Sequence, residues 1–482
     1  MHHDHRGAGH GWRGAVAIVA AAALLAAGGC EPQRAKGPVW TNPLDVTEAH
    51  LVQDPKDKDY VLSRMEFGRL AILLGSPLRA KPRLLEAFEQ LDVEHENVGA
   101  AISSERFKYY KGETYERAML CIYLAMIEYQ TGDTNNARIF LARALDADRA
   151  AVVKDSTPRE VGEDFGLAYY WIGKTYARLN DADNSAIAFR KAATPTPRKE
   201  KDAARELKDD RRKADRWQKL SAEGERWTYE TFHNPEKPEL FIDGIVNLAL
   251  VRGTDTAAPA ALSDATPDNP VLQRPTTPAE FFTPDYQDAS NLVLTIEVGR
   301  CPFKYLGGIS GERTEFGRFP ILPHAVRVYI DGHDAGPAFK VLDLWDQAAT
   351  QDRIGEKEVA QTGKALLREL LKQAPMGGSM ADNWDVSGDV RHWTSLPGRV
   401  YIFAGKVTPG LHSIRLEMFD ANGNTLPRWT TTWHGLAVPK TGETCLLLNP
   451  SYDGDNRLPP DDVQKAVKGG ARPGLPAEAW AY

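Results

Sequence analysis

Cysteine is scarce in this sequence, with four among 482 residues. Small secreted domains that depend on disulfide bonds carry a much denser set, so a disulfide framework is excluded. The chain also lacks a basic excess, because 59 lysines and arginines face 66 aspartates and glutamates and leave a net charge of −7. A main role in nucleic-acid binding is therefore not expected.

Catalytic and metal-binding motifs are lacking as well. The sequence contains no HExxH, no GxSxG, no Walker loop and no CxxC pair. These motifs place a metal, a nucleophile or a phosphate cradle at fixed offsets, and the scattered histidines do not follow metal-ligand spacing either. We therefore predict a non-enzymatic protein with no catalytic residue, no metal and no cofactor.

Long apolar runs are also lacking, apart from Ala15–Ala27 near the start. That run follows a basic head and is shorter than the ~20 residues of a membrane span, which is typical of a secretory signal. Cys30 follows closely, and the stretch Leu25–Cys30 resembles the lipobox of bacterial lipoproteins, with Ala27 where leucine is usual. The resemblance implies removal of residues 1–29 and lipidation of Cys30. A soluble secreted protein cleaved at the same place is the alternative.

This N-terminus predicts the location of the mature protein. We expect a chain anchored in a membrane by the lipid on Cys30, with residues 30–60 as a polar tether. The expected site is the cell envelope, on the outer side of the cytoplasmic membrane. Where the organism has an outer membrane, its periplasmic face is expected instead.

Residues 61–194 are predicted to form a tetratricopeptide-like array of helices. Ala118–Leu145 and Leu167–Ala193 share an order of small and large apolar residues, and both resemble the 34-residue tetratricopeptide repeat;. Gly68–Ala87 is a more degenerate copy. The expected turns are at Gly75, Gly132 and Asn180, since glycine and asparagine adopt the left-handed conformation that ends a helix;.

Stacked hairpins of this kind form a concave groove, built mainly from the first helix of each pair. The residues predicted to face the groove are Arg69, Met126, Tyr129, Gln130, Tyr170, Lys174 and Arg178. Their aromatic and basic side chains suit an extended acidic or amphipathic ligand, such as a segment of another envelope protein. The alternative is that they pack against the protein's own C-terminal half, and the sequence leaves both open.

The second half changes period. Residues 195–227 predict a charged linker helix, and residues 228–450 predict an α+β domain with an antiparallel sheet, one long helix over 352–373 and a Pro-rich insertion over 254–284;. The tail, residues 451–482, is rich in proline and glycine. The expected strands are Leu292–Val298, Ala325–Asp331, Arg399–Gly405, Leu411–Phe419, Arg428–Trp433 and Glu443–Leu448.

Three polar segments carry a further resemblance. Tyr110–Arg117 resembles a Y-x-G-E-x-Y-E-R motif, Gly299–Lys304 a Gly-x-x-Pro-x-Lys turn, and Asp389–Pro397 a D-x-R-x-W-x-x-L-P element. Together they are similar to a family of uncharacterised bacterial lipoproteins with N-terminal helical repeats. The resemblance implies an envelope lipoprotein and no established reaction. We interpret Tyr110–Arg117 as a structural lock at a helix start, with Thr114 as the cap, rather than as a catalytic motif.

Two questions remain open from the sequence. Cys301 and Cys445 both lie in the second half and form a disulfide only if the fold brings their Cα atoms to ~5.5 Å;. A rival function is glycan binding or envelope enzyme activity by the sheet domain. It rests on four tryptophans whose aromatic rings could stack on sugars, namely Trp384, Trp393, Trp429 and Trp433.

Overall fold

A computed structural model gives the fold. It describes residues 48, 51–73, 76–91, 108–153, 165–193, 269–307, 313–317, 323–352 and 389–449. The predicted signal, Cys30, the linker over 195–227, the tail and all but the first residue of the helix predicted over 352–373 lie outside these residues. Among the helices described, none is both long and apolar enough to cross a bilayer.

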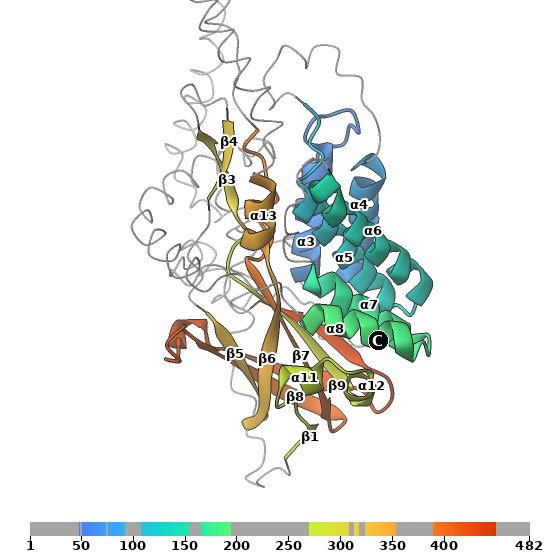
Figure 1. The fold of residues 1–482 in the computed structure, drawn as a ribbon, viewed down its shortest axis with the longest axis vertical. Coiled ribbons are helices and arrows are strands. Elements are labelled where there is room, and N and C mark those ends of the chain that lie inside the picture. The colour runs from blue at the N-terminus through green and yellow to red at the C-terminus, as the bar shows by residue number, and fades with distance from the viewer. Residues whose placement is uncertain are drawn as a thin grey trace, which may run out of the picture. The chain divides into compact units, whose positions relative to one another are not determined.

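Three antiparallel helical hairpins make up the first half (Figure 1). Their helices are α3 (Tyr60–Leu73) with α4 (Pro77–Leu91), α5 (Thr114–Gln130) with α6 (Thr134–Val153), and α7 (Gly166–Arg178) with α8 (Ala182–Ala193). The hairpins stack in sequence order, with an edge-to-face contact between Phe88 of α4 and Phe140 of α6 at 5.4 Å. The prediction of a repeated helical array is confirmed.

Small residues allow the two helices of each hairpin to approach closely. A Cβ on Gly68 would lie 2.3 Å from the Leu84 side chain, and one on Gly173 would lie 2.6 Å from the Phe189 ring. These contacts pair a small residue on the first helix with a large apolar one on the second. The spacing of small and large residues in the sequence therefore determines how closely the two helices of a hairpin pack, because only glycine leaves room for the opposing side chain.

The turns of the second and third hairpins repeat one local design. Gly132 and Asn180 both adopt left-handed backbone conformations, with φ of 87° and 58°, as predicted. In the second hairpin, the carboxylate of Asp133 accepts a hydrogen bond from the backbone N–H of Asn136. In the third hairpin, the carboxylate of Asp181 accepts the corresponding bond from the backbone N–H of Asn184. Each aspartate thereby satisfies an N–H at the start of the second helix. Gly75, the third predicted turn residue, lies outside the described residues.

The second half is built around one eight-stranded sheet. The sheet order is β10-β2-β7-β6-β5-β8-β9, with β1 paired to β7. The strands are β1 (Val271–Gln273), β2 (Leu292–Val298), β5 (Ala325–Ile330), β6 (His333–Asp343), β7 (Arg399–Val407), β8 (Gly410–Phe419), β9 (Thr431–Val438) and β10 (Thr444–Leu448). The prediction of a purely antiparallel sheet is wrong, because β10 pairs with β2 in parallel.

The sheet bends at β6 and closes into a nearly complete barrel. The first part of β6 pairs with β5, and its last part, from Phe339, pairs with β7. The end strands also approach each other, since the Thr444 hydroxyl on β10 donates to the Ala437 carbonyl on β9 over 3.3 Å. Inside this sheet lies an apolar core that takes alternate residues of β2, such as Leu294 and Ile296.

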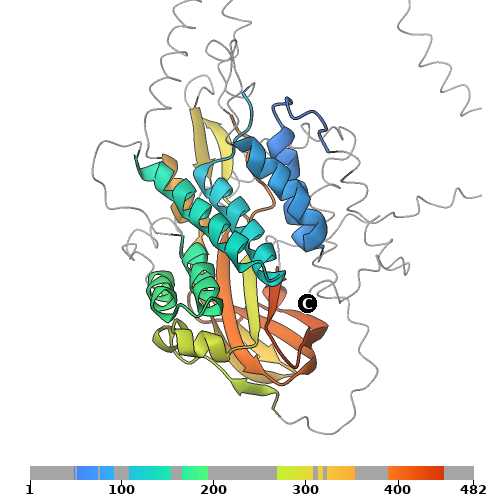
Figure 2. The ribbon, with the colours of Figure 1, turned by 90° about the vertical axis from the view of Figure 1, so that its right-hand side faces the viewer.

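The other face of the β2–β7 region packs on the helical array (Figure 2). Val293, Ile402 and Ala404 belong to the same hydrophobic cluster as α3, α5 and α7. β2 and β7 are therefore buried on both sides, and the array and the sheet share one core. Leu51 and Val52 also belong to this cluster, so the packed body begins within the segment predicted as a tether.

The remaining elements are short, and several differ from expectation. Part of the predicted Pro-rich insertion forms β1 and helix α11 (Pro278–Phe281), which is followed by α12 (Pro284–Ala289). A 3-10 turn, Pro427–Trp429, occupies the start of the strand expected at Arg428, so β9 begins only at Thr431. A separate hairpin of β3 (Phe303–Gly307) and β4 (Arg313–Gly317) precedes β5, and α13 (Leu344–Asp352) follows β6.

Candidate functional site

The predicted groove residues gather around a carboxylate of the protein's own second half. Glu443, which directly precedes β10, accepts a bond from Lys174 Nζ and a 2.9 Å bond from the Tyr129 hydroxyl. Arg178 Nη2 lies 3.5 Å from the same carboxylate. Gln130 Nε2 donates to the Cys445 backbone carbonyl over 2.9 Å. Two consecutive hairpins thus hold one extended acidic segment.

The other predicted groove residues also contact the second half. Arg69 forms an ion pair with Glu297 on β2, and the Tyr170 hydroxyl donates to Gln287 Oε1 on α12 over 2.8 Å. Met126 is buried in the shared hydrophobic cluster. The predicted groove residues therefore pack against the protein's own C-terminal half, which is one of the two alternatives that the sequence left open. The segment that they contact enters strand β10 and carries one carboxylate, that of Glu443.

The polar contacts of this site are sheltered from water. Lys174 is nearly fully buried, and it also donates to the Gln287 carbonyl over 3.2 Å. Burial raises the pKa of the Tyr129 phenol well above its ordinary value, and the negative charge of Glu443 adds to the effect. Tyr129 therefore stays protonated and keeps donating to Glu443. In a site of low dielectric such charge-assisted bonds are strong, and breaking one leaves a buried charge.

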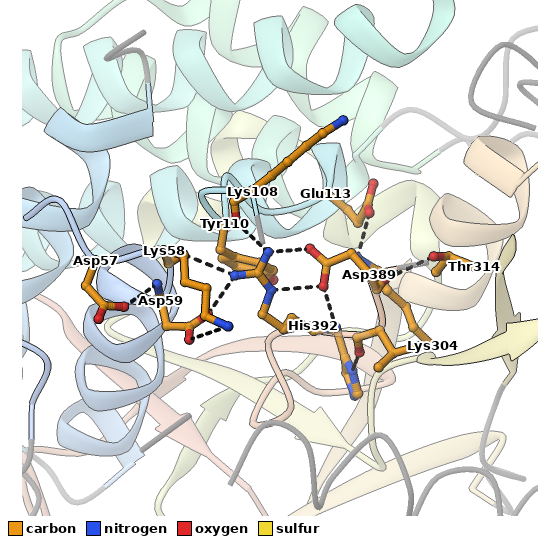
Figure 3. A network of polar contacts seen from close by, with 12 residues as sticks. Asp57, Lys58, Asp59, Lys108, Tyr110, Glu113, Lys304, Thr314, Asp389 and His392 are labelled. Carbon is orange, nitrogen blue, oxygen red and sulfur yellow. Dashed lines mark hydrogen bonds and ion pairs between the residues drawn. The ribbon is translucent and has the colours of Figure 1, made fainter. Parts of the chain in front are cut away.

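A second polar cluster joins the three polar segments that the sequence singled out, 110–117, 299–304 and 389–397 (Figure 3). Glu113 is the N-cap of α5, and its side chain pairs with Lys304 over 2.6 Å. Glu116 accepts the Trp393 backbone N–H over 2.6 Å and the Tyr110 hydroxyl over 2.7 Å. Segments 110–117, 299–304 and 389–397 thus meet at one point. These contacts form a structural lock at the start of α5, as predicted for Tyr110–Arg117. The N-cap residue, however, is Glu113 rather than Thr114.

Arg391 is the centre of this second cluster. Its guanidinium pairs with Asp59 over 2.6 Å and with Asp389 over 2.7 Å, and it donates to the Lys108 carbonyl over 2.7 Å. The side chain is fully buried. The start of α3, the segment before α5 and the 389–397 segment are therefore tied to one cation, and removal of that cation would leave two carboxylates facing each other.

Two groups near this cluster have strongly shifted pKa values. Burial raises the pKa of Glu66 to about 7, although the Thr394 N–H and hydroxyl both donate to its carboxylate, at 2.6 and 2.7 Å. Burial also lowers the pKa of His392 to about 4, and its Nδ1 lies 3.0 Å from the Val390 carbonyl. Glu66 therefore titrates near neutrality, while His392 is uncharged there.

The sequence did not single out Glu66, Glu297, Glu443 or the central role of Arg391. One signal was available, since the apolar residues of α3 and α5 are spread around each helix with no wide polar face, and such helices are buried almost all round;. A charge inside such a helix, such as Glu66 or Arg69, has to find its partner within the fold.

The structure also places the cysteines and the tryptophans about which the sequence left questions open. Cys301 and Cys445 are both buried, and they do not form a disulfide with each other. Cys445 lies beside Val293 near the start of β2, whereas Cys301 follows the end of β2, so roughly eight residues at ~3.3 Å each separate them;. Trp393 and Trp429 are buried, Trp433 is half-buried and Trp384 lies outside the described residues. Trp393 and Trp429 thus pack in the core. Neither is available to stack on a sugar, so much of the support for a glycan-binding surface is lost.

The Glu443 site is closed by the chain's own side chains. Its carboxylates are each engaged by N–H, O–H or cationic donors of the same chain. No group of three metal-ligating side chains occurs in the part of the chain that the structure describes. What the arrangement does is to hold an extended acidic segment against two helical hairpins and to fix the sheet domain on the array.

Residues 167–194 match the tetratricopeptide repeat family. The match falls on α7 and α8, where the sequence predicted a repeat. Tetratricopeptide repeats generally mediate protein–protein interaction, so the match suggests an interaction scaffold;. No curated protein and no solved structure matches the chain.

Proposed function

We propose that this protein is a lipid-anchored, non-enzymatic scaffold of the cell envelope that binds a partner protein through its helical repeats. The observation that carries the proposal is the Glu443 site, because it shows the first helices of two hairpins binding an extended acidic segment. A surface of this chemistry is suited to protein recognition, since backbone and carboxylate contacts are both provided.

The anchor part of the proposal rests on the N-terminal sequence. Cys30 follows a secretory signal and resembles a lipobox cysteine. Twenty residues separate it from Leu51, the first core residue of the body, and so many residues reach at most about 70 Å when fully extended;. A lipid on Cys30 would therefore keep the array close to the membrane surface and raise its effective concentration for partners there.

Membrane fractionation with Cys30→Ser tests the anchor. We expect the wild-type protein in the membrane fraction and Cys30→Ser in the soluble fraction. Cys301→Ser is the matched control, because it removes a thiol and leaves Cys30 in place. A mass spectrum of the mature N-terminus should show a lipidated cysteine in the wild type. Persistent membrane association of Cys30→Ser, or an unmodified Cys30, would refute the anchor.

A further inference from the structure

The segment that fills the groove is an end strand of the sheet. Among the described strands, β10 pairs with β2 and with no other, and it does so in parallel. Glu443 stands at the free start of β10, after the turn that contains Gly442 with φ of 89°. Release of the Glu443 end would therefore break the ladder hydrogen bonds to one strand only, whereas release of a central strand would break those to two;.

Two donors of the carboxylate site are held in place by contacts other than Glu443. Arg178 Nη1 donates to the Tyr129 carbonyl over 2.5 Å, and its guanidinium lies 3.5 Å from the centre of the Tyr129 ring. Lys174 is held independently by the Gln287 carbonyl. The positions of these donors thus do not depend on Glu443, and a site that is already arranged loses little entropy on binding.

One end of the site reaches solvent. The Arg178 side chain is 34% exposed and that of Glu443 is 11% exposed, whereas Lys174 deeper in the site is 4% exposed. An outside carboxylate can therefore approach along Arg178 and exchange with Glu443. The basic charge of the donors selects an acidic group.

Gln130 adds a requirement on the shape of the ligand. Its amide bonds the main-chain carbonyl of Cys445, two residues after the carboxylate that Tyr129 and Lys174 hold. This spacing fits an extended chain, because a strand advances by about 3.3 Å per residue and so separates the two contact points along the groove. A free carboxylate ion would use only half of the site.

We propose that Tyr129, Gln130, Lys174 and Arg178 form a peptide-binding site that the chain's own Glu443 segment closes, and that a partner protein binds by placing an extended acidic segment there instead. The proposal rests on the scaffold function above and names the chemistry of the partner. The Glu443 segment acts as a built-in competitor. Partner binding is then governed by how readily that segment is released.

A labelled peptide with the sequence of residues 440–448, and serine in place of Cys445, serves as the probe. Its binding is measured by fluorescence anisotropy to the secreted chain carrying Cys30→Ser, with and without Glu443→Gln. We expect Glu443→Gln to bind the peptide at least about tenfold more tightly, because the competitor has lost its charge. Adding Lys174→Met should abolish the gain. Glu417→Gln, whose carboxylate bonds Tyr329 on the sheet instead, is the matched control and should bind as the parent does.

Two outcomes would overturn the proposal. One is equal peptide affinity for Glu443→Gln and its parent, and the other is equal affinity for a peptide with glutamine at the Glu443 position. A second measurement needs no variant and therefore still applies if Glu443→Gln does not fold. When the free peptide is added to the unmutated chain, hydrogen exchange at residues 444–448 should become faster. Exchange in β7 should stay unchanged. No change in β10 would also refute the proposal. Failure of these tests leaves the membrane fractionation result unaffected, so the two proposals fail separately.

Discussion

The guanidinium of Arg69 and the carboxylate of Glu297 form an ion pair in which both side chains are fully buried. Arg69 belongs to the first helix of the array and Glu297 to β2, so the pair joins the two halves of the fold. The Tyr123 hydroxyl donates to Glu297 over 2.7 Å from a second hairpin. A pair that is buried in this way stabilises the fold only while both partners are present.

Arg69→Met should destabilise the protein by about 3 kcal/mol, because Glu297 would keep its charge in an apolar interface without a cation. Arg69→Met combined with Glu297→Leu should recover most of that loss, since neither charge is then buried. Urea unfolding of the single and double variants measures both values. A single variant as stable as the wild type would show that the pair does not couple the two halves.

Glu66→Gln should make the stability of the protein less dependent on pH. The pKa of Glu66 is about 7 in the fold, against an ordinary value near 4.5. The folded state therefore holds an extra proton between these values, and the contribution of this group to stability falls as pH rises from about 4.5 to 7.

The difference in unfolding free energy between Glu66→Gln and the wild type should accordingly grow in favour of the variant between pH 5 and pH 8, by about 2 kcal/mol. Urea unfolding at both pH values gives this difference. Glu417→Gln, at a half-exposed position of the sheet, is measured alongside as the control for the loss of a carboxylate. A difference that is constant with pH would contradict a protonated Glu66 in the fold.

His392→Gln should act in the opposite direction, on the acid side. The pKa of His392 is about 4 in the fold, below its ordinary value of 6.5, because burial disfavours the charged ring. Unfolding therefore takes up a proton between these values, and stability is lost as pH falls from about 6.5 to 4. The variant should lose less stability than the wild type over this range in thermal unfolding. Parallel losses would indicate that His392 is exposed to water.

The three cysteines of the body should all react as reduced thiols once the protein is unfolded. Cys121, Cys301 and Cys445 are buried and form no disulfide with one another, and burial raises the pKa of the Cys445 thiol well above its ordinary value. In the Cys30→Ser chain purified without reductant, a thiol reagent should therefore label three groups after unfolding in guanidinium. In the native protein, Cys445 should react slowly, as identified by mass spectrometry of the labelled peptides. One labelled thiol after unfolding would reveal a disulfide.

Local patterns were sufficient for much of the fold. The alternation of Leu292–Val298 predicted β2 with its observed bounds, because a period of two places alternate residues on the two faces of a strand;. The small residues at Gly68 and Gly173 marked helix contacts, and Gly132 and Asn180 marked the turns. Each of these features depends on residues close together in the sequence, so the sequence carries the information directly.

Contacts between distant segments could not be predicted in the same way. Glu116 meets Trp393, and Lys174 meets Glu443, across most of the length of the chain. The parallel pairing of β10 with β2 also depends on where the chain returns after β9. No periodicity encodes such a meeting, because it depends on how whole elements pack.

The sequence by itself determined the helical hairpins, most of the strands and the chemistry of the groove residues, since these follow from side-chain size, period and charge. Only the tertiary structure decided what the groove holds. The array and the sheet each leave an apolar face that is stable only when covered, and packing these faces together brings Glu443 between Lys174 and Tyr129;. The groove that the sequence predicted for a partner is thus first a site for the protein's own strand.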